Sequence, residues 1–176
     1  MASKEIVSNL NKNYNVLAIC DNLNPEKNIL ETYKLLLKKY KKVCVITTNR
    51  LSSTLMTTFD DNRIDYSNCF FIDCVSSKLM KAVSNDKVYY LPSPHALTEL
   101  SLKFSSIIGK YDLVIFDNLD SLLLYNSEVF VLRFLNSIMS RVQQKKIKAL
   151  YWIMLEGKKK IVSDISLFVD STVLVK

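Results

Sequence analysis

One carboxylate in the sequence stands where it could take part in metal chemistry. The run Asp112-Leu-Val-Ile-Phe-Asp117 has the form of an apolar strand that closes on an acidic residue. In enzymes that transfer phosphoryl groups, a carboxylate in this position holds a magnesium ion or its water. Apolar strands that end in aspartate also occur where the carboxylate only caps the next turn. Both interpretations of Asp117 stay open, and we expect Asp73 and Asp120 to be capping carboxylates.

The sequence contains few of the cysteine and histidine residues that other kinds of catalytic or metal site require. None of the four cysteines forms a Cys-x-x-Cys pair with metal-ligand spacing, and each lies in or beside an apolar run. We therefore expect buried structural thiols. His95 is the only histidine, which leaves little for a histidine-rich metal site or a Ser-His-Asp relay. We predict no catalytic residue and no metal site.

The basic residues are clustered in the sequence. The chain carries 24 Lys and Arg against 17 Asp and Glu, a formal net charge of +7. Two clusters join a helix end to a following strand and could form one basic surface at the amino edge of a parallel sheet: Lys38, Lys39, Lys41, Lys42, Lys145, Lys146 and Lys148. As cations at helix C-termini they also complement the helix dipole. A third cluster, residues 158–160, has no interleaved aromatic residues, so stacking on bases is not indicated there.

Length and composition favour one ordinary globular domain over residues 1–176, with a core from about residue 15 to 175. Apolar residues make up 49% of the chain and come in short clusters, and no uninterrupted apolar run is long enough to span a membrane. The N-terminus Met-Ala-Ser-Lys-Glu has no apolar segment of the secretory kind. We expect a soluble, cytoplasmic protein without a membrane partner.

The elements that must position these residues alternate between strands and helices. Apolar, β-branched runs predict strands at Asn15–Cys20, Lys42–Thr48, Cys69–Asp73, Lys87–Leu91, Asp112–Asp117, Ile147–Leu155 and Phe168–Val175. Apolar residues at three-to-four spacing predict helices at Glu26–Tyr40, Pro94–Ile108 and Asn126–Gln144. Several strands are apolar on successive residues, as in strands buried on both faces of a parallel sheet. The predicted fold class is α/β, with a mostly parallel sheet flanked by helices in three layers.

This order of elements resembles the KaiC-like branch of the RecA superfamily over roughly residues 15 to 175. The resemblance rests on a strand followed by a long helix, a strand ending in Thr47-Thr48, and a Phe-Phe-Ile-Asp strand. It continues with a Ser-Pro-x-Ala-Leu helix start, the strand that closes on Asp117, and a final Phe168-Val-Asp-Ser-Thr-Val run. It implies a RecA-like P-loop NTPase fold in which Asp117 is the Walker B carboxylate.

The phosphate loop of that family is degenerate here. The family motif G-x-x-x-x-G-K-[ST] cradles phosphates with its backbone amides. In its place stands Asp21-Asn-Leu-Asn-Pro-Glu-Lys27-Asn28. Lys27 and Asn28 fall where the motif has its lysine and hydroxyl residue. Two carboxylates replace the glycines, however, and Pro25 removes a backbone donor. We expect a fold that lacks a functional P-loop, with Lys27, Asn28 and Asp117 as a vestigial nucleotide site.

A second departure concerns the catalytic base. ATP-hydrolysing members of the family resemble one another in placing a glutamate after the second strand, where it orients the attacking water. This chain has Thr47-Thr48-Asn49-Arg50 there. An asparagine cannot act as a general base, and Arg50 has the wrong charge.

These departures favour a catalytically inactive RecA/KaiC-like domain that serves as a regulatory or protein-binding module. The expected partner is a RecA-like relative or a second copy of the chain, in an oligomer, and no cofactor is expected. Two alternatives remain. One is a weak ATP-binding protein that uses magnesium with Lys27, Asn28 and Asp117. The other is a nucleic-acid accessory protein of the recombination-mediator kind.

Overall fold

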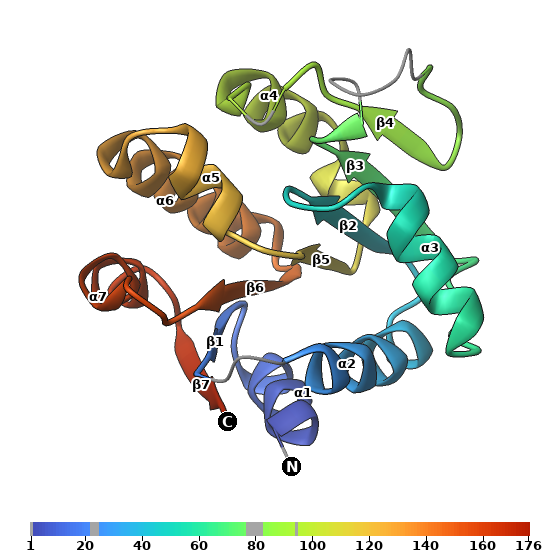
Figure 1. The fold of residues 1–176 in the computed structure, drawn as a ribbon, viewed down its shortest axis with the longest axis horizontal. Coiled ribbons are helices and arrows are strands. Elements are labelled where there is room, and N and C mark those ends of the chain that lie inside the picture. Colours follow the sequence, from blue (N-terminus) through green and yellow to red (C-terminus); the bar gives the residue numbers. More distant parts are fainter. Residues whose placement is uncertain (1, 22–24, 77–82, 94) are drawn as a thin grey trace.

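The structure, a computed structural model, describes residues 2–21, 25–76, 83–93 and 95–176. Helices and strands alternate along the chain (Figure 1). Their order is α1 (Ala2–Lys12), β1 (Asn15–Cys20), α2 (Glu26–Lys39), β2 (Val43–Thr47), α3 (Ser52–Asp61), β3 (Cys69–Asp73), β4 (Val88–Tyr90), α4 (Leu97–Ile107), the 3-10 helix η2 (Ile108–Lys110), β5 (Leu113–Phe116), α5 (Asp120–Tyr125), α6 (Glu128–Lys145), β6 (Lys148–Met154), α7 (Lys159–Ser166) and β7 (Ser171–Val175).

The strands form one seven-stranded sheet with the order β4-β3-β2-β5-β6-β1-β7. Every neighbouring pair is parallel. The predicted three-layer α/β fold is confirmed, and the sheet is parallel throughout where we expected it to be mostly so. Because all strands point the same way, the residues that follow them meet at one edge, the carboxyl edge. The residues that precede them meet at the opposite, amino edge.

Helices cover both faces of the sheet, as the apolar strands require. On one face, buried side chains of α1, α2 and α3 pack against the sheet. On the other face, α4, α5, α6 and α7 do so. The strand β2 illustrates the division, because Val43 and Val45 belong to the first core while Cys44 and Ile46 belong to the second. All five residues of β2 are buried.

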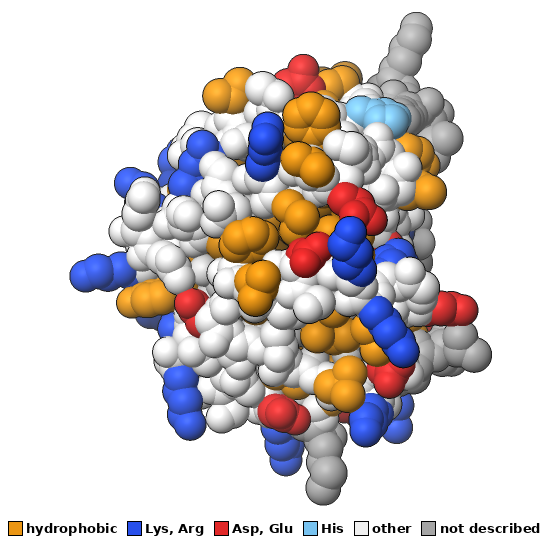
Figure 2. All heavy atoms as spheres, turned by 90° about the vertical axis from the view of Figure 1, so that its left-hand side faces the viewer, with side chains coloured by type: hydrophobic (Ala, Val, Ile, Leu, Met, Phe, Trp, Pro, Cys, Tyr) orange, Lys and Arg blue, Asp and Glu red, His pale blue; other side chains and the backbone are white. Residues whose placement is uncertain are grey.

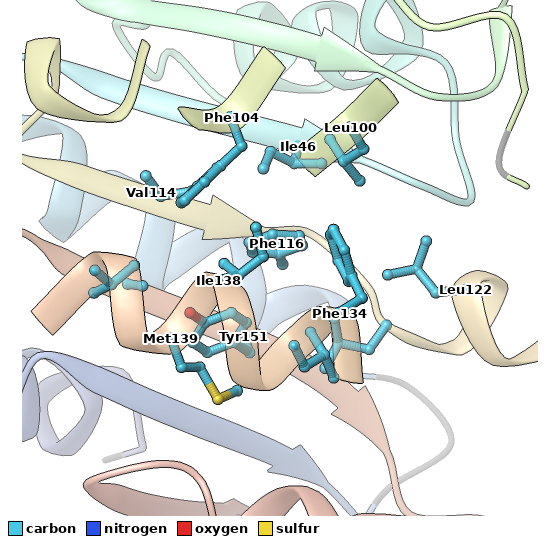
Figure 3. Close-up of a cluster of buried hydrophobic side chains, with 14 of the residues drawn as sticks. Ile46, Leu100, Phe104, Val114, Phe116, Leu122, Phe134, Ile138, Met139 and Tyr151 are labelled. Atoms are coloured by element: carbon cyan, nitrogen blue, oxygen red, sulfur yellow. The ribbon is translucent and has the colours of Figure 1, made fainter. Parts of the chain in front are cut away.

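The core under α4 and α6 is rich in aromatic side chains (Figure 3). The rings of Phe116 and Tyr151, on adjacent strands, stack with their centroids 5.1 Å apart. Phe134 of α6 meets Phe116 edge-on at 6.4 Å. The Tyr151 hydroxyl donates to Asn15 Oδ1 at 3.0 Å, so this buried polar group is satisfied inside the core.

Four α-helices in the described part of the chain have no counterpart in the sequence prediction: α1, α3, α5 and α7. Of these, α1 packs Ile6 and Leu10 into the core ahead of Asn15, where we expected the core to begin. The helix predicted from Asn126 begins at Glu128 and is preceded by the short helix α5. The helix predicted from Pro94 begins at Leu97, and Pro94 itself lies outside the described residues. No helix in the described part of the chain is long and apolar enough to cross a membrane.

Candidate functional site

A small cavity lies at the carboxyl edge, beside the start of α2 and the ends of β2, β5 and β6. Its volume is about 260 Å³. It is lined by Pro25, Glu26, Ile29, Leu30, Asn49, Arg50, Asp117, Asn118 and Met154. In open parallel sheets ligands bind at this edge, so the cavity is the natural place to look for chemistry.

Asp117 is held there by a guanidinium and a phenol. Arg50 Nε donates to Asp117 Oδ2 and Arg50 Nη2 donates to Asp117 Oδ1, both at 2.7 Å. The Tyr33 hydroxyl donates to Oδ1 at 3.0 Å. Two charge-assisted hydrogen bonds from one arginine are among the strong arrangements that a carboxylate can accept from a side chain. Both carboxylate oxygens are therefore occupied by donors from the protein itself.

Asp117 is removed from water, and Arg50 is partly buried. The side chain of Asp117 is 1% exposed and that of Arg50 is 26% exposed. Burial alone would lower the pKa of Arg50, but its hydrogen bonds to Asp117 and the charge of that carboxylate outweigh burial and raise the pKa. Burial, followed by the charge of Asp117, raises the pKa of Tyr33 well above its ordinary value. Arg50 is thus a cation and Tyr33 a neutral donor at any physiological pH.

The sheet brings Arg50 to Asp117. Strands β2 and β5 are neighbours in register, with Ile46 opposite Phe116, and the Asp117 amide donates to the Ile46 carbonyl at 3.0 Å. The Thr48 hydroxyl donates to the Asn118 carbonyl, which ties the two strand ends together beyond the ladder. Arg50, which follows β2, therefore lies at the same edge of the sheet as Asp117, which follows the neighbouring strand β5.

Asp73 fixes the segment that carries Arg50. Its Oδ2 accepts the backbone amide of Ser52 at 2.7 Å, at the first residue of α3, and the Ser76 hydroxyl at 2.6 Å. Its Oδ1 accepts the amides of Val75 and Ser76, each at 2.8 Å. Burial would raise the pKa of Asp73, but these hydrogen bonds outweigh it and lower the pKa. Asp73 is a capping carboxylate, as expected from the sequence.

Asp117 does not cap the turn that follows its strand, the simpler of our two interpretations. In that turn the Asp120 amide is bound by Asn118 Oδ1 at 2.6 Å. Asp120 in turn forms an ion pair with Lys158 at 3.2 Å and accepts the Met154 amide at 3.4 Å. Lys158 is therefore partly neutralised within the chain.

Lys27 and Asn28, the other two residues of the expected vestigial site, lie in the first turn of α2. Lys27 is exposed and lines a different cavity, of about 700 Å³, between α2 and the turn after α3. The carbonyl of Asn28 accepts the Thr32 hydroxyl at 2.7 Å. Neither residue lines the cavity that holds Asp117. Residues 22–24, in the middle of the degenerate loop, lie outside the described residues.

The thiols of the chain are buried and protonated. All four cysteines are free. Cys20 lines a third cavity of about 330 Å³ beside the end of β6. Burial, with a further contribution from the charge of Asp120, raises the pKa of Cys20 to about 12, so its thiolate is a minor species at neutral pH. No group of three or more His, Cys, Asp or Glu in the described residues could hold a metal ion.

Sequence reasoning missed the partners of Asp117. It identified Arg50 as a residue of the wrong charge for a base, without assigning it a partner, and it did not single out Tyr33. One available signal was the scarcity of arginine: the chain has few, and Arg50 comes soon after a buried strand.

Comparisons with known proteins bear on the fold. No family model matches the sequence, and no curated protein matches it. Among solved structures, the chain is similar to the KaiC-like protein PH0186 from the hyperthermophilic archaeon Pyrococcus horikoshii OT3. The TM-score is 0.63 and the identity is 10%, and the match covers 92% of this chain and 70% of that one. The chain therefore has a RecA-like fold, as its order of elements suggested.

Proposed function

We propose that this chain is a catalytically inactive RecA-like domain that acts as a protein-binding module, and that its partner is a second copy of itself. The proposal that the domain is catalytically inactive rests on one observation: Arg50 donates hydrogen bonds to both oxygens of Asp117. A carboxylate that serves phosphoryl transfer must present an oxygen to magnesium or its water. Here the partly buried Arg50 already donates to both oxygens, and a metal ion would have to displace it.

The surroundings of the pair support the same conclusion. Glu26 lines the cavity and, with Asp21 nearby in sequence, would repel the phosphates of a nucleotide. Pro25, which also lines it, has no amide to donate to a phosphate. Asn49 and Arg50 occupy the segment in which a hydrolytic relative would carry its base, and neither can accept a proton from water at neutral pH.

The protein-binding part rests on an exposed apolar face. Four side chains on α4, α5 and α6 are between 57% and 76% exposed: Leu102, Leu124, Val129 and Phe130. We call them the apolar face. Figure 2, which views the side of the molecule that carries α5, α6 and α7, shows several groups of exposed hydrophobic side chains on this side. Exposed apolar groups clustered in this way mark interaction sites more often than isolated ones do.

A groove adjoins the apolar face. Its volume is about 490 Å³, and Leu102 and Phe130 line it together with Arg133 and Phe134. Its walls come from α4 and α6, which pack against each other. A side chain from a partner, such as a second Phe130, would find apolar contact there and an arginine at the rim.

The charges beside Phe130 favour a second copy as the partner. Exposed Glu128 and Arg133 flank Phe130 on the same helix. If two copies of α6 cross antiparallel near Phe130, each Glu128 lies beside the Arg133 of the other copy. A patch that complements itself in this way is what a two-fold symmetric dimer requires.

Sedimentation velocity over a range of concentrations tests the dimer. We expect self-association that Arg133→Glu weakens by about tenfold, through repulsion between its new carboxylate and the partner's Glu128. The double variant Glu128→Arg/Arg133→Glu restores the opposite charges and should recover the affinity of the original chain. Phe130→Glu should give a monomer. A chain that stays monomeric at every concentration, or a double variant as weak as the single one, contradicts the proposal.

Calorimetric titration with magnesium-ATP, magnesium-ADP and magnesium-GTP tests the proposal that the domain is catalytically inactive. We expect no heat of binding at millimolar nucleotide for the original chain. Saturable binding that is lost in Lys27→Ala would instead support the alternative of a weak ATP-binding protein. It would overturn our interpretation of the degenerate loop.

A further inference from the structure

The lysines of this protein are concentrated at the amino edge of the sheet. Four segments lead into the neighbouring strands β2, β5, β6 and β1. They are residues 38–43, 108–113, 145–148 and 12–15, and we call them the basic edge. Together they contain nine lysines and a single acidic residue, Asp112. Because the strands are parallel and adjacent, these segments lie side by side.

The basic edge accounts for the whole positive excess of the chain. The sequence has 24 basic and 17 acidic residues. Without the nine lysines and Asp112, 15 basic and 16 acidic residues remain, so the rest of the molecule is close to neutral. A general lysine bias in composition would spread the charge over the surface and would not leave it all on one edge.

The carboxylates near the basic edge are already engaged with backbone amides. Asp112 Oδ2 accepts the Lys42 amide at 3.0 Å. Asp170, which precedes β7, accepts the amides of Tyr14 and Asn15 at 2.9 and 2.8 Å. Within the described residues, none of the nine lysines forms an ion pair with a carboxylate. Their positive charge is therefore available to a negatively charged partner.

Helix dipoles explain only part of this accumulation. Lys12, Lys38, Lys39 and Lys145 lie in the last turns of α1, α2 and α6, where a cation is favourable. The remaining five lie beyond those turns: Lys41, Lys42, Lys110, Lys146 and Lys148. Burial lowers the pKa of Lys148, and repulsion by Lys39 adds to this shift. The charge of Asp170 acts in the opposite direction but is outweighed.

Aromatic side chains are interleaved with these lysines. Tyr14, Tyr40 and Tyr111 fall in three of the four segments and are partly exposed. The Lys148 ammonium lies 4.7 Å from the ring centroid of Tyr14, and that of Lys39 lies 5.6 Å from the centroid of Tyr40. Basic residues that follow a backbone and aromatic rings that accept bases are the two components of single-strand binding surfaces.

We infer that the basic edge binds the phosphate backbone of single-stranded nucleic acid without sequence preference. Lysine is a point charge and does not form the planar fork with which arginine reads guanine, so the contacts are to phosphates. A membrane surface fits less well, because none of the large apolar side chains of the four segments is exposed for insertion. This surface shares no residue with the apolar face.

Fluorescence anisotropy of a labelled oligothymidylate of about 30 nucleotides tests the inference. The test variant is Lys41→Gln/Lys42→Gln/Lys146→Gln, whose three side chains are all exposed. The matched control is Lys4→Gln/Lys159→Gln/Lys160→Gln, which removes the same charge from exposed positions outside the basic edge. Comparison of the two separates this edge from net charge.

We expect the original chain to bind, with an affinity that falls steeply as salt rises from about 50 to 200 mM. The test variant should bind at least about tenfold more weakly and lose roughly two units of the slope of log affinity against log salt, at about 0.7 units per phosphate. The control should bind like the original chain. An absence of binding at low salt, or equal losses in both variants, overturns the inference.

Competition identifies the class of polyanion. Unlabelled oligothymidylate should displace the probe far better than polyglutamate of equal charge or phosphatidylserine vesicles do. Polyglutamate that competes equally well would overturn the nucleic-acid assignment and point to an acidic protein segment. Better competition by the vesicles would overturn it in favour of a membrane surface. The Phe130→Glu variant should bind the probe with the intrinsic affinity of the basic edge, which separates this test from that of the dimer.

Discussion

Arg50 gives Asp117 a permanent counter-ion, and this determines what the carboxylate can do. Asp117 is buried and needs a counter-ion, because its carboxylate has lost its hydration. The Tyr33 hydroxyl adds a third donor from α2, so the pair joins β5, the segment after β2 and the helix that follows the degenerate loop. The same residues that remove the metal site thus connect three elements.

Removal of Arg50 should therefore destabilise the fold. Arg50→Ala leaves the Asp117 carboxylate buried without a counter-ion, and we expect the free energy of unfolding to fall by about 3–5 kcal/mol. Urea denaturation measures the loss. In Arg50→Ala/Asp117→Asn no uncompensated charge remains, so this variant should recover a large part of the stability. A loss below about 1 kcal/mol in the single variant would mean that the pair is solvated and has no such role.

Because of Asp73, the stability of the protein should depend on pH in the acidic range. Because the folded pKa lies below the ordinary value, the carboxylate stabilises the fold fully above about pH 3.9 and loses this contribution as the pH falls through the folded pKa. Asp73→Asn should cost about 1.5–3 kcal/mol at neutral pH, and its difference from the original chain should shrink below about pH 4.

Urea midpoints between neutral and acidic pH would measure the effect of Asp73→Asn. Exposed Asp86→Asn is the control and should change the midpoint little at any pH. A difference for Asp73→Asn that stays constant down to acidic pH would show that the carboxylate charge is not what the amides of Ser52 and Ser76 bind.

At the scale of elements, the strands were predictable and several helices were not. Two strands, Asn15–Cys20 and Cys69–Asp73, have the predicted bounds, because buried parallel strands are continuous apolar runs with polar ends. Helix α3 has the sequence Ser-Ser-Thr-Leu-Met-Thr-Thr-Phe-Asp-Asp, in which hydroxyl and acidic residues disfavour a helix locally. Its fully buried Leu55 and Phe59 pack it against the sheet, and that tertiary contact outweighs propensity.

The end of α6 offers a test of local backbone strain. Lys146, its C-cap, has φ 55° and ψ 33°, a left-handed conformation that glycine adopts without steric cost. Lys146→Gly should raise the free energy of unfolding by about 0.5–1 kcal/mol. The neighbouring Lys145→Gly, at the last residue of the helix, should lower it by up to about 1 kcal/mol. Thermal unfolding of the two variants would reveal the opposite signs, and equal effects would contradict the assigned helix end.

At the scale of the whole molecule, the sheet order decides which residues form the site. The sequence placed Asp117 and Arg50 at the ends of two strands, but only the adjacency of β2 and β5 makes them partners. Strand order is set by packing among many elements and leaves no local mark in the sequence. The same holds for the basic edge, whose segments come from distant parts of the chain and meet because β2, β5, β6 and β1 are neighbours.

The position of Trp152 has a practical consequence for all of these measurements. It is the only tryptophan, it lies on β6 with 2% of its surface exposed, and it belongs to the core beneath α1 and α2. Its fluorescence should therefore be emitted from an apolar environment in the folded chain and shift to longer wavelength on unfolding. The protein carries its own optical probe of that core, and polynucleotide bound at the basic edge should leave the emission wavelength unchanged.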